Sequence, residues 1–317
     1  MDSSAAEIAY EFPPFYVLYK DGHVKRLIGT DFVQASLDPQ TGVSSKDVII
    51  VPETGVSARL YLPKITDPHQ KLPLLIYFHG GGFVIETAFS PTYHYYLNSL
   101  VAQANIVAVS VEYRRAPEYP LPIAYDDSWA VLQWVVSHSM DQDGAEPWLR
   151  DHVDCKRIFL AGDSAGANIA HDMAMRAGAT GLKLRGIALI HPYFWGEKRI
   201  GSEAEDPDKA KMADKMWLLA CPSSAGADDP RINPVGEGAP SLSRLGCSRL
   251  LVCVGEKDIL KDRGLIYYET LVKSGWSGEA EIMESQGEDH VFHLFNPTCE
   301  KAVTLMKRLV SFVNIDD

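Results

Sequence analysis

Short apolar runs alternate with amphipathic segments along most of the chain. The apolar runs have the length of strands and end at a glycine or a polar turn, and they occupy residues 57–63, 72–78, 106–113, 157–162, 185–193 and 249–255. Segments with helical periodicity lie between them, at residues 95–104, 124–139, 166–179 and 265–275. This alternation predicts an α/β fold with a mostly parallel central sheet flanked by helices, whose site lies beyond the carboxyl ends of the strands.

Two segments depart from this rhythm. Residues 1 to about 45 are rich in aromatic, proline and charged residues, and they show no clear strand alternation. Residues 199–245 begin as a polar stretch and continue through proline, glycine and aspartate turns. We therefore expect a single domain over residues 1–317, in which these two segments form a cap over the site.

Composition and charge narrow the classes of function. Hydrophobic residues make up 46% of the chain and charged residues 23%, as in ordinary globular proteins. The formal charge of -12 would repel phosphate groups and anionic lipids, and the apolar runs are too short to span a bilayer. We expect neither a nucleic-acid partner nor a membrane partner, and the oligomeric state stays open. The N-terminal residues lack the features of a secretory signal and the five cysteines lack CxxC spacing, which favours a cytoplasmic protein with reduced thiols.

The sharpest motif is Gly162-Asp163-Ser164-Ala165-Gly166. It directly follows a predicted strand and directly precedes a predicted helix. A G-x-S-x-G sequence in this context is typical of a nucleophile elbow, in which the serine occupies a strained turn and its neighbours two residues away must be nearly free of side chains. The motif predicts that Ser164 is a nucleophile at the amino end of a helix, where negative charge is stabilised.

A second motif, His79-Gly80-Gly81-Gly82-Phe83, follows the strand predicted at 72–78. Consecutive glycines allow backbone N–H groups to converge on one oxygen, as a tetrahedral acyl-transfer intermediate requires. We predict that Gly81 and Gly82, together with Ala165, form an oxyanion hole, although Gly80 is an alternative donor. The sequence lacks the G-x-G-x-x-G and GK[ST] patterns of phosphate loops, and His79 is expected to orient the loop.

A serine nucleophile needs an imidazole base that is itself held by a carboxylate. Asp258 follows the strand predicted at 249–255, and His290 lies on a later loop, in the chain order that α/β hydrolases use. The alternatives that remain open are Asp262 for the acid and His293 for the base and, more weakly, Glu256 and Asp289. The histidine spacing matches no H-E-x-x-H motif, so we predict no metal and no cofactor.

Apolar side chains that follow these loops are candidates for contacts with the substrate, although aromatic residues after strands are equally often part of the core. The candidates are Phe83, Val84, Tyr193, Trp195 and Val291.

Taken together, these motifs resemble a known family. The sequences HGGGF, YRRAPEYPLPIAYDD at 113–127, GDSAGAN at 162–168 and DILKDR at 258–263, with the loop of His290, resemble the hormone-sensitive-lipase-like branch of the α/β hydrolases. Nearly the whole chain is similar to the plant carboxylesterases and to their relatives, the 2-hydroxyisoflavanone dehydratases. The resemblance implies an α/β-hydrolase fold whose cap is formed by the N-terminal segment and part of 199–245.

The family also contains members that lack esterase activity. The gibberellin receptors lack the catalytic histidine, and the legume dehydratases carry threonine in place of the nucleophilic serine, whereas this chain has both His290 and Ser164. The resemblance therefore implies a carboxylesterase that hydrolyses small carboxylic esters. The alternatives are a lyase, in which His290 removes a proton alpha to a carbonyl without acylation of Ser164, and a non-catalytic receptor for a small molecule.

Overall fold

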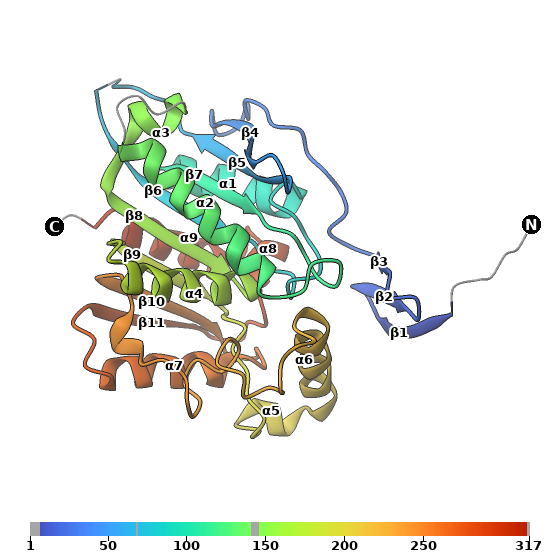
Figure 1. Cartoon of the computed structure of the whole chain (residues 1–317). Coiled ribbons are helices and arrows are strands. Elements are labelled where there is room, and N and C mark those ends of the chain that lie inside the picture. The colour runs from blue at the N-terminus through green and yellow to red at the C-terminus, as the bar shows by residue number, and fades with distance from the viewer. Residues whose placement is uncertain (1–6, 68, 141–145, 316–317) are drawn as a thin grey trace, which may run out of the picture.

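The computed structural model describes residues 7–67, 69–140 and 146–315, which fold around an eight-stranded sheet (Figure 1). In spatial order the strands are β11 (Glu279–Ser285), β10 (Arg249–Gly255), β9 (Gly186–Ile190), β8 (Val153–Asp163), β6 (Leu72–Phe78), β7 (Val107–Glu112), β5 (Val56–Leu62) and β4 (Ser44–Val51). The pairs β4–β5 and β5–β7 are antiparallel and all the others are parallel. The predicted α/β fold with a mostly parallel sheet is therefore confirmed.

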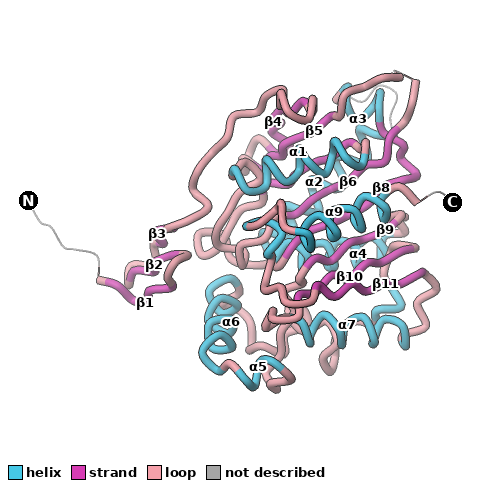
Figure 2. The backbone as a smooth tube through the Cα atoms, turned by 180° about the vertical axis from the view of Figure 1, so that it is seen from behind, coloured by secondary structure: helices cyan, strands magenta, loops and turns pink. Residues whose placement is uncertain are grey.

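Helices cover both faces of the sheet, which explains why central strands such as β6 are buried along their whole length. One face carries α1 (Pro91–Ala104) and α9 (Glu300–Val313), as the view from behind shows (Figure 2). The other face carries α2 (Ile123–Met140), α4 (Ala165–Thr180) and α7 (Lys261–Lys273). The short helical segments include α3 (Pro147–His152), α8 (Phe292–Phe295) and a 3-10 turn at Leu242–Arg244. No helix within the described residues combines the length and the apolarity that crossing a bilayer requires.

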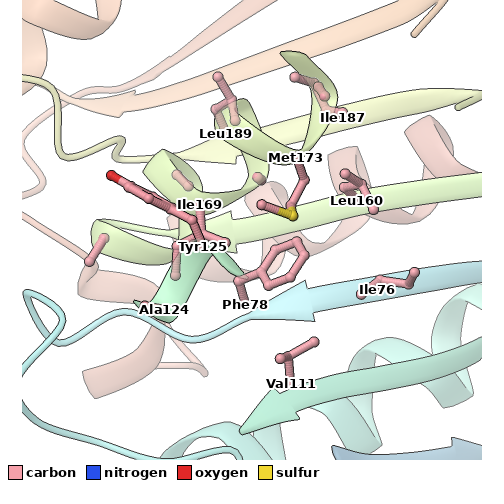
Figure 3. Packing of buried hydrophobic residues seen from close by; sticks show 14 of the residues in the cluster. Ile76, Phe78, Val111, Ala124, Tyr125, Leu160, Ile169, Met173, Ile187 and Leu189 are labelled. Atoms are coloured by element: carbon pink, nitrogen blue, oxygen red, sulfur yellow. The ribbon is translucent and has the colours of Figure 1, made fainter. Parts of the chain in front are cut away.

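The packing of α4 on the sheet fixes the position of the predicted nucleophile. Met173 of α4 lies over Phe78 of β6 and Leu160 of β8 (Figure 3). All three side chains are at most 1% exposed, so the apolar surface that they remove from water holds the helix on the strand that it follows. The turn between β8 and α4 is consequently fixed at both ends.

Two outer segments lie outside the main sheet and its covering helices. The first is a three-stranded sheet of β1 (Ile8–Phe12), β2 (Tyr16–Tyr19) and β3 (Val24–Arg26), and the second contains α5 (Ser202–Glu205) and α6 (Pro207–Ala220). Both are near the same end of the main sheet (Figure 1). The strands β1–β3 lie within residues 1 to about 45, where the sequence showed no clear strand alternation, and β4 lies between that segment and the first predicted strand at 57–63. They are short or partly exposed, so their side chains do not alternate cleanly between apolar and polar.

Candidate active site

Ser164 occupies the sharp turn between the end of β8 and the start of α4. Its backbone has φ 54° and ψ -119°, a conformation that L-residues rarely adopt. A Cβ on Gly162 would lie 2.3 Å from the carbonyl carbon of Gly166, and a Cβ on Gly166 would lie 1.9 Å from the carbonyl oxygen of Phe78. Only glycine fits at these two positions, which is the physical reason for the G-x-S-x-G spacing.

A chain of short polar contacts links Ser164 to His290 and Asp258. Ser164 Oγ lies 2.9 Å from His290 Nε2, and His290 Nδ1 lies 2.8 Å from Asp258 Oδ2. The second oxygen of Asp258 accepts a hydrogen bond from the N–H of Leu260 at 2.9 Å. The structure thus brings together the three side chains that the sequence singled out as nucleophile, base and acid.

The electrostatics of this chain suit a proton acceptor. Burial alone would raise the pKa of Asp258, but the charge of His290 and the hydrogen bonds from His191 and His290 hold that pKa well below its usual range. Burial works against a charged His290, yet the charge of Asp258 and their hydrogen bond raise the pKa of His290 above its ordinary value. Asp258 therefore remains an anion that stabilises a proton on His290.

The alternative acids and bases take no part in the contacts between Ser164, His290 and Asp258. Asp262 accepts hydrogen bonds from the N–H and hydroxyl groups of Ser202, at the start of α5. His293 is buried, and neither of its ring nitrogens has a partner among the described residues. Glu256 accepts a hydrogen bond from the N–H of Gly287, and Asp289 accepts one from the N–H of His290.

The glycine loop after β6 turns beside the nucleophile elbow. Gly81 and Gly82 have φ values of 97° and 61°, which favour glycine. The N–H of Gly80 donates to the hydroxyl of Tyr93 at 2.8 Å, so this group is already engaged. The N–H groups of Gly81, Gly82 and Ala165 donate to no protein acceptor in the part of the chain that the structure describes.

A buried network that the sequence analysis did not predict supports this loop. Tyr93 of α1 accepts the Gly80 N–H and donates its hydroxyl to one oxygen of Asp163, while Tyr77 of β6 donates to the other oxygen, both at 2.9 Å. Burial raises the pKa of Asp163 to about 6, against the effect of these two hydrogen bonds. The residue beside the nucleophile thereby ties the elbow to the glycine loop.

The ring of His79 contacts the glycine loop, and its role in orienting that loop stays a prediction. Its Nδ1 lies 2.8 Å from the carbonyl oxygen of Gly80, and its ring stacks on Tyr113 with centroids 4.2 Å apart. Burial, together with the charge of Arg115, lowers the pKa of His79 to about 3, so the side chain is neutral at physiological pH. A neutral ring can donate to the loop without competing with His290 for a proton.

Two further residues near the site also escaped the sequence analysis. His191 directly follows β9, and its Nδ1 lies 2.9 Å from the same oxygen of Asp258 that faces His290. Arg26 of β3 donates to the carbonyl oxygens of Val84 at 2.6 Å and Ala116 at 3.0 Å. A signal for His191 was present, because it lies near the end of the apolar run predicted at 185–193, which forms β9 between β8 and β10. Arg26 carried no comparable signal.

The predicted substrate contacts are placed unevenly. Phe83, Val84, Tyr193 and Trp195 are at most 3% exposed and belong to the main core cluster. Val291 is partly exposed and directly follows His290. A role for any of them in substrate binding stays a prediction.

One group of side chains in the described residues has atoms close enough together to hold a metal ion. It consists of His191, Asp258 and His290, whose candidate ligand atoms lie within 4.8 Å of one another. His191 Nδ1 and His290 Nδ1 both lie within hydrogen-bond distance of the Asp258 carboxylate. Hydrogen bonds therefore account for the cluster, and the lack of a metal or cofactor stays a prediction.

With this geometry established, the class of the protein is clear: the chain belongs to a family of the alpha/beta hydrolase fold, whose model matches residues 75–294. Over 316 residues it is 50% identical to probable carboxylesterase 2 of Arabidopsis thaliana, with 99% of each chain covered. It is also 46% identical to a 2-hydroxyisoflavanone dehydratase of Glycine max, with 98% of this chain and 99% of the relative covered. The resemblance to plant carboxylesterases and these dehydratases is therefore confirmed.

Solved structures agree with the assignment. A thermostable carboxylesterase cloned from a metagenomic library matches with a TM-score of 0.74 at 28% identity, covering 89% of this chain and 90% of the other. An esterase from the archaeon Pyrobaculum calidifontis matches with a TM-score of 0.73 at 28% identity, covering 85% and 84%.

Proposed function

We propose that this protein is a carboxylesterase that hydrolyses small carboxylic esters through an acyl-enzyme. The observation that carries the proposal is the continuous chain from Ser164 through His290 to Asp258, with two contacts of 2.9 and 2.8 Å. In the first step Ser164 Oγ attacks the ester carbonyl and His290 Nε2 takes its proton, while Asp258 fixes the ring and stabilises the imidazolium. His290 then protonates the leaving alcohol, and it activates the water that releases the acid.

The N–H groups of Gly81, Gly82 and Ala165 form the oxyanion hole in this proposal. Their lack of partners among the described residues and the engagement of the Gly80 N–H by Tyr93 support this choice of donors. Each such donor stabilises the transition state by roughly 3 kcal/mol. Ala165 is also the first residue of α4, so the helix dipole adds to the stabilisation of the oxyanion.

The two outer segments form the cap over this site in the proposal. A Cβ on Gly82 would lie 2.0 Å from the sulfur of Met216, so α6 is packed directly against the glycine loop. Lys209 of α6 lies 3.7 Å from Asp289, the neighbour of His290. The segment containing α6 therefore reaches both the oxyanion side and the base side of the site.

The test is the hydrolysis of p-nitrophenyl acetate by the wild type, Ser164→Ala and Ser137→Ala, with labelling by a fluorophosphonate. Ser137 is an exposed serine of α2 and is the matched control. We expect turnover and labelling in the wild type and the control, and the loss of both in Ser164→Ala. Absence of turnover in the wild type, or equal turnover in Ser164→Ala, would contradict the proposal.

The alternative to be excluded is a lyase, because two related chains are named 2-hydroxyisoflavanone dehydratase. An elimination uses His290 and the oxyanion hole but needs no acylation of Ser164. Assay of the same variants with a 2-hydroxyisoflavanone separates the two reactions. Elimination that survives in Ser164→Ala would identify a lyase.

A further inference from the structure

We propose that His191 is a positioning residue for the esterase reaction: a second imidazole that holds Asp258 in the orientation His290 needs. This inference rests on the proposed function of the site. His191 Nδ1 lies 2.9 Å from Asp258 Oδ2, the oxygen that also lies 2.8 Å from His290 Nδ1. Because an ionised carboxylate only accepts hydrogen bonds, both ring nitrogens are N–H donors.

The contacts of Asp258 show what His191 adds. Without His191, the carboxylate would keep the Leu260 N–H on Oδ1 and His290 on Oδ2, which is one donor for each oxygen. The carboxylate could still rock about the line between these two contacts. A third donor, from another strand, removes that freedom. Asp258 and His191 are 0% and 1% exposed, so bulk water does not reach their contact.

The backbone places His191 for this contact. It is the first residue after β9, which lies between β8, the strand before Ser164, and β10, the strand before Asp258. Its N–H donates to the carbonyl oxygen of Cys253 in β10 at 2.7 Å. Its φ is 48°, a positive value that few residues other than glycine adopt, and Ser164 and Val291 also have positive φ.

The charges around His191 make it a neutral donor. The titratable groups that face it are Asp258, His290 and Asp289, and its ring also packs against His293 with centroids 5.9 Å apart. Burial lowers the pKa of His191, against the effect of Asp258. Its Nε2 has no partner in the described part of the chain, as expected for a ring that carries its proton on Nδ1. A neutral donor orients the carboxylate and leaves its negative charge available to the His290 imidazolium.

The kinetic test compares His191→Leu with His191→Asn over a range of pH. Leucine removes the donor, whereas asparagine retains an N–H near the position of Nδ1 and tolerates a positive φ. We expect His191→Leu to lower kcat/KM about 10- to 100-fold, and His191→Asn to restore most of that loss. Loss of one donor leaves Asp258 more basic toward His290. The acid limb of the pH profile of kcat/KM reports the pKa of His290, which the charges of Asp163 and Asp289 also raise. The midpoint of this limb should therefore move to higher pH in His191→Leu.

The matched control is His171, another buried histidine. It is 7% exposed, its Nδ1 lies 2.9 Å from the hydroxyl of Tyr267, and burial lowers its pKa to about 4. His171→Leu and His171→Asn measure the cost of removing a buried neutral ring away from Asp258. If the His191 and His171 variants lose equal activity with the same acid limb, His191 only fills space and the proposal is wrong.

A spectroscopic measurement keeps the test independent of turnover. In protein labelled with 15N-histidine, we expect two strongly deshielded Nδ1–H protons, one from His191 and one from His290. His191→Asn should remove one of them, and Asp258→Asn should shift both upfield. A single deshielded proton that survives in His191→Asn would overturn the inference, even if the protein hydrolysed no ester.

Discussion

The sheet edge, by which we mean the carboxyl ends of the parallel strands with Ser164, Asp258 and His290, differs from the outer segments in part of its polar contacts. The outer segments also have buried contacts, such as the ion pair between Glu203 of α5 and Arg263 of α7. At the sheet edge, Asp163 is 1% exposed and binds two tyrosine hydroxyls. The outer segments meet the rest of the molecule partly through exposed polar contacts, such as that between Arg26 and Glu118, whose side chain is 45% exposed. In Figure 1 the β1–β3 sheet is joined to β4 by a long connection and stands apart from the main sheet.

This difference indicates that the sheet edge and the outer segments have different roles in the reaction. Buried hydrogen bonds to charged groups are costly to break, so the positions of the reacting atoms are strongly determined. Exposed ion pairs contribute little to stability, and loops that rest on them change with little cost to the fold. We infer that the sheet edge determines the chemistry and that the outer segments determine which ester is accepted. Four substitutions test this comparison.

Asp258→Asn should have the largest effect because it removes the charge that supports His290. We expect kcat/KM to fall about 10 000-fold, with little change in substrate binding. The charge of Asp258 raises the pKa of His290, so its loss should also move the acid limb of the residual activity to lower pH. The measurement is the pH dependence of kcat/KM. A loss below tenfold would mean that Asp258 does not support the base.

Tyr93→Phe should have the next largest effect. It leaves the Gly80 N–H without its acceptor and Asp163 with one tyrosine donor instead of two. We expect a loss of about tenfold in kcat and of about 1 to 3 kcal/mol in the free energy of unfolding, which assays and urea titration measure. Tyr96→Phe is the matched control, because it lies on the same helix and its hydroxyl has no partner among the described residues. Equal effects of the two substitutions would show that the network does not support the loop.

The sheet edge was largely predictable from the sequence for a physical reason. The glycines around Ser164 and in the loop of Gly81 are required by local backbone geometry, and local requirements appear as short motifs. The choice of Asp258 over Asp262 was not settled by the sequence, because it depends on which carboxylate reaches an imidazole 32 residues later in the chain. The hydrogen-bond network of Asp163 joins three segments that are distant in the sequence, so no short sequence motif indicates it.

The outer segments were the least predictable part. Their existence as departures from the strand–helix rhythm was evident, but the strands β1–β3 were not expected. Phe12 and Tyr16 bury their rings in the core, at 2% and 1% exposure, yet neighbouring positions on both strands are partly exposed. The burial of these side chains is determined by contact with other segments, so the apolar residues do not follow the period of two by which a strand is recognised in a sequence.

Arg26→Ala should have a smaller effect and a different character. The change removes the donors to the Val84 and Ala116 carbonyls and to Glu118, which hold β3 beside the glycine loop. We expect KM to rise about threefold to tenfold with kcat nearly unchanged, because the reacting groups keep their positions. Lys25→Ala, an exposed change on the same strand, is the control. A loss in kcat as large as that of Tyr93→Phe would contradict the proposal that the outer segments affect substrate binding and not the chemical step.

Asp289→Asn should have the smallest effect. It tests the contact between the loop of His290 and α6 of the outer segments. Asp289 directly precedes His290 and lies 3.7 Å from Lys209 of α6, with side chains that are 57% and 50% exposed. Its charge is among the causes that raise the pKa of His290, after those of Asp258 and Asp163. Because His290 must be neutral to accept the proton, the acid limb of kcat/KM should move to lower pH, by about a few tenths of a unit.

The kcat/KM of Asp289→Asn should therefore be slightly higher than that of the wild type at pH values below the midpoint of the acid limb, and equal to it at higher pH. Added salt should reduce the difference, since an exposed charge is screened. Asp208→Asn, an exposed change of the same charge on α6, should leave the limb in place. If Asp289→Asn instead changed kcat at all pH values, α6 would help to hold His290, and the base side of the site would depend on an outer segment as well as on the sheet.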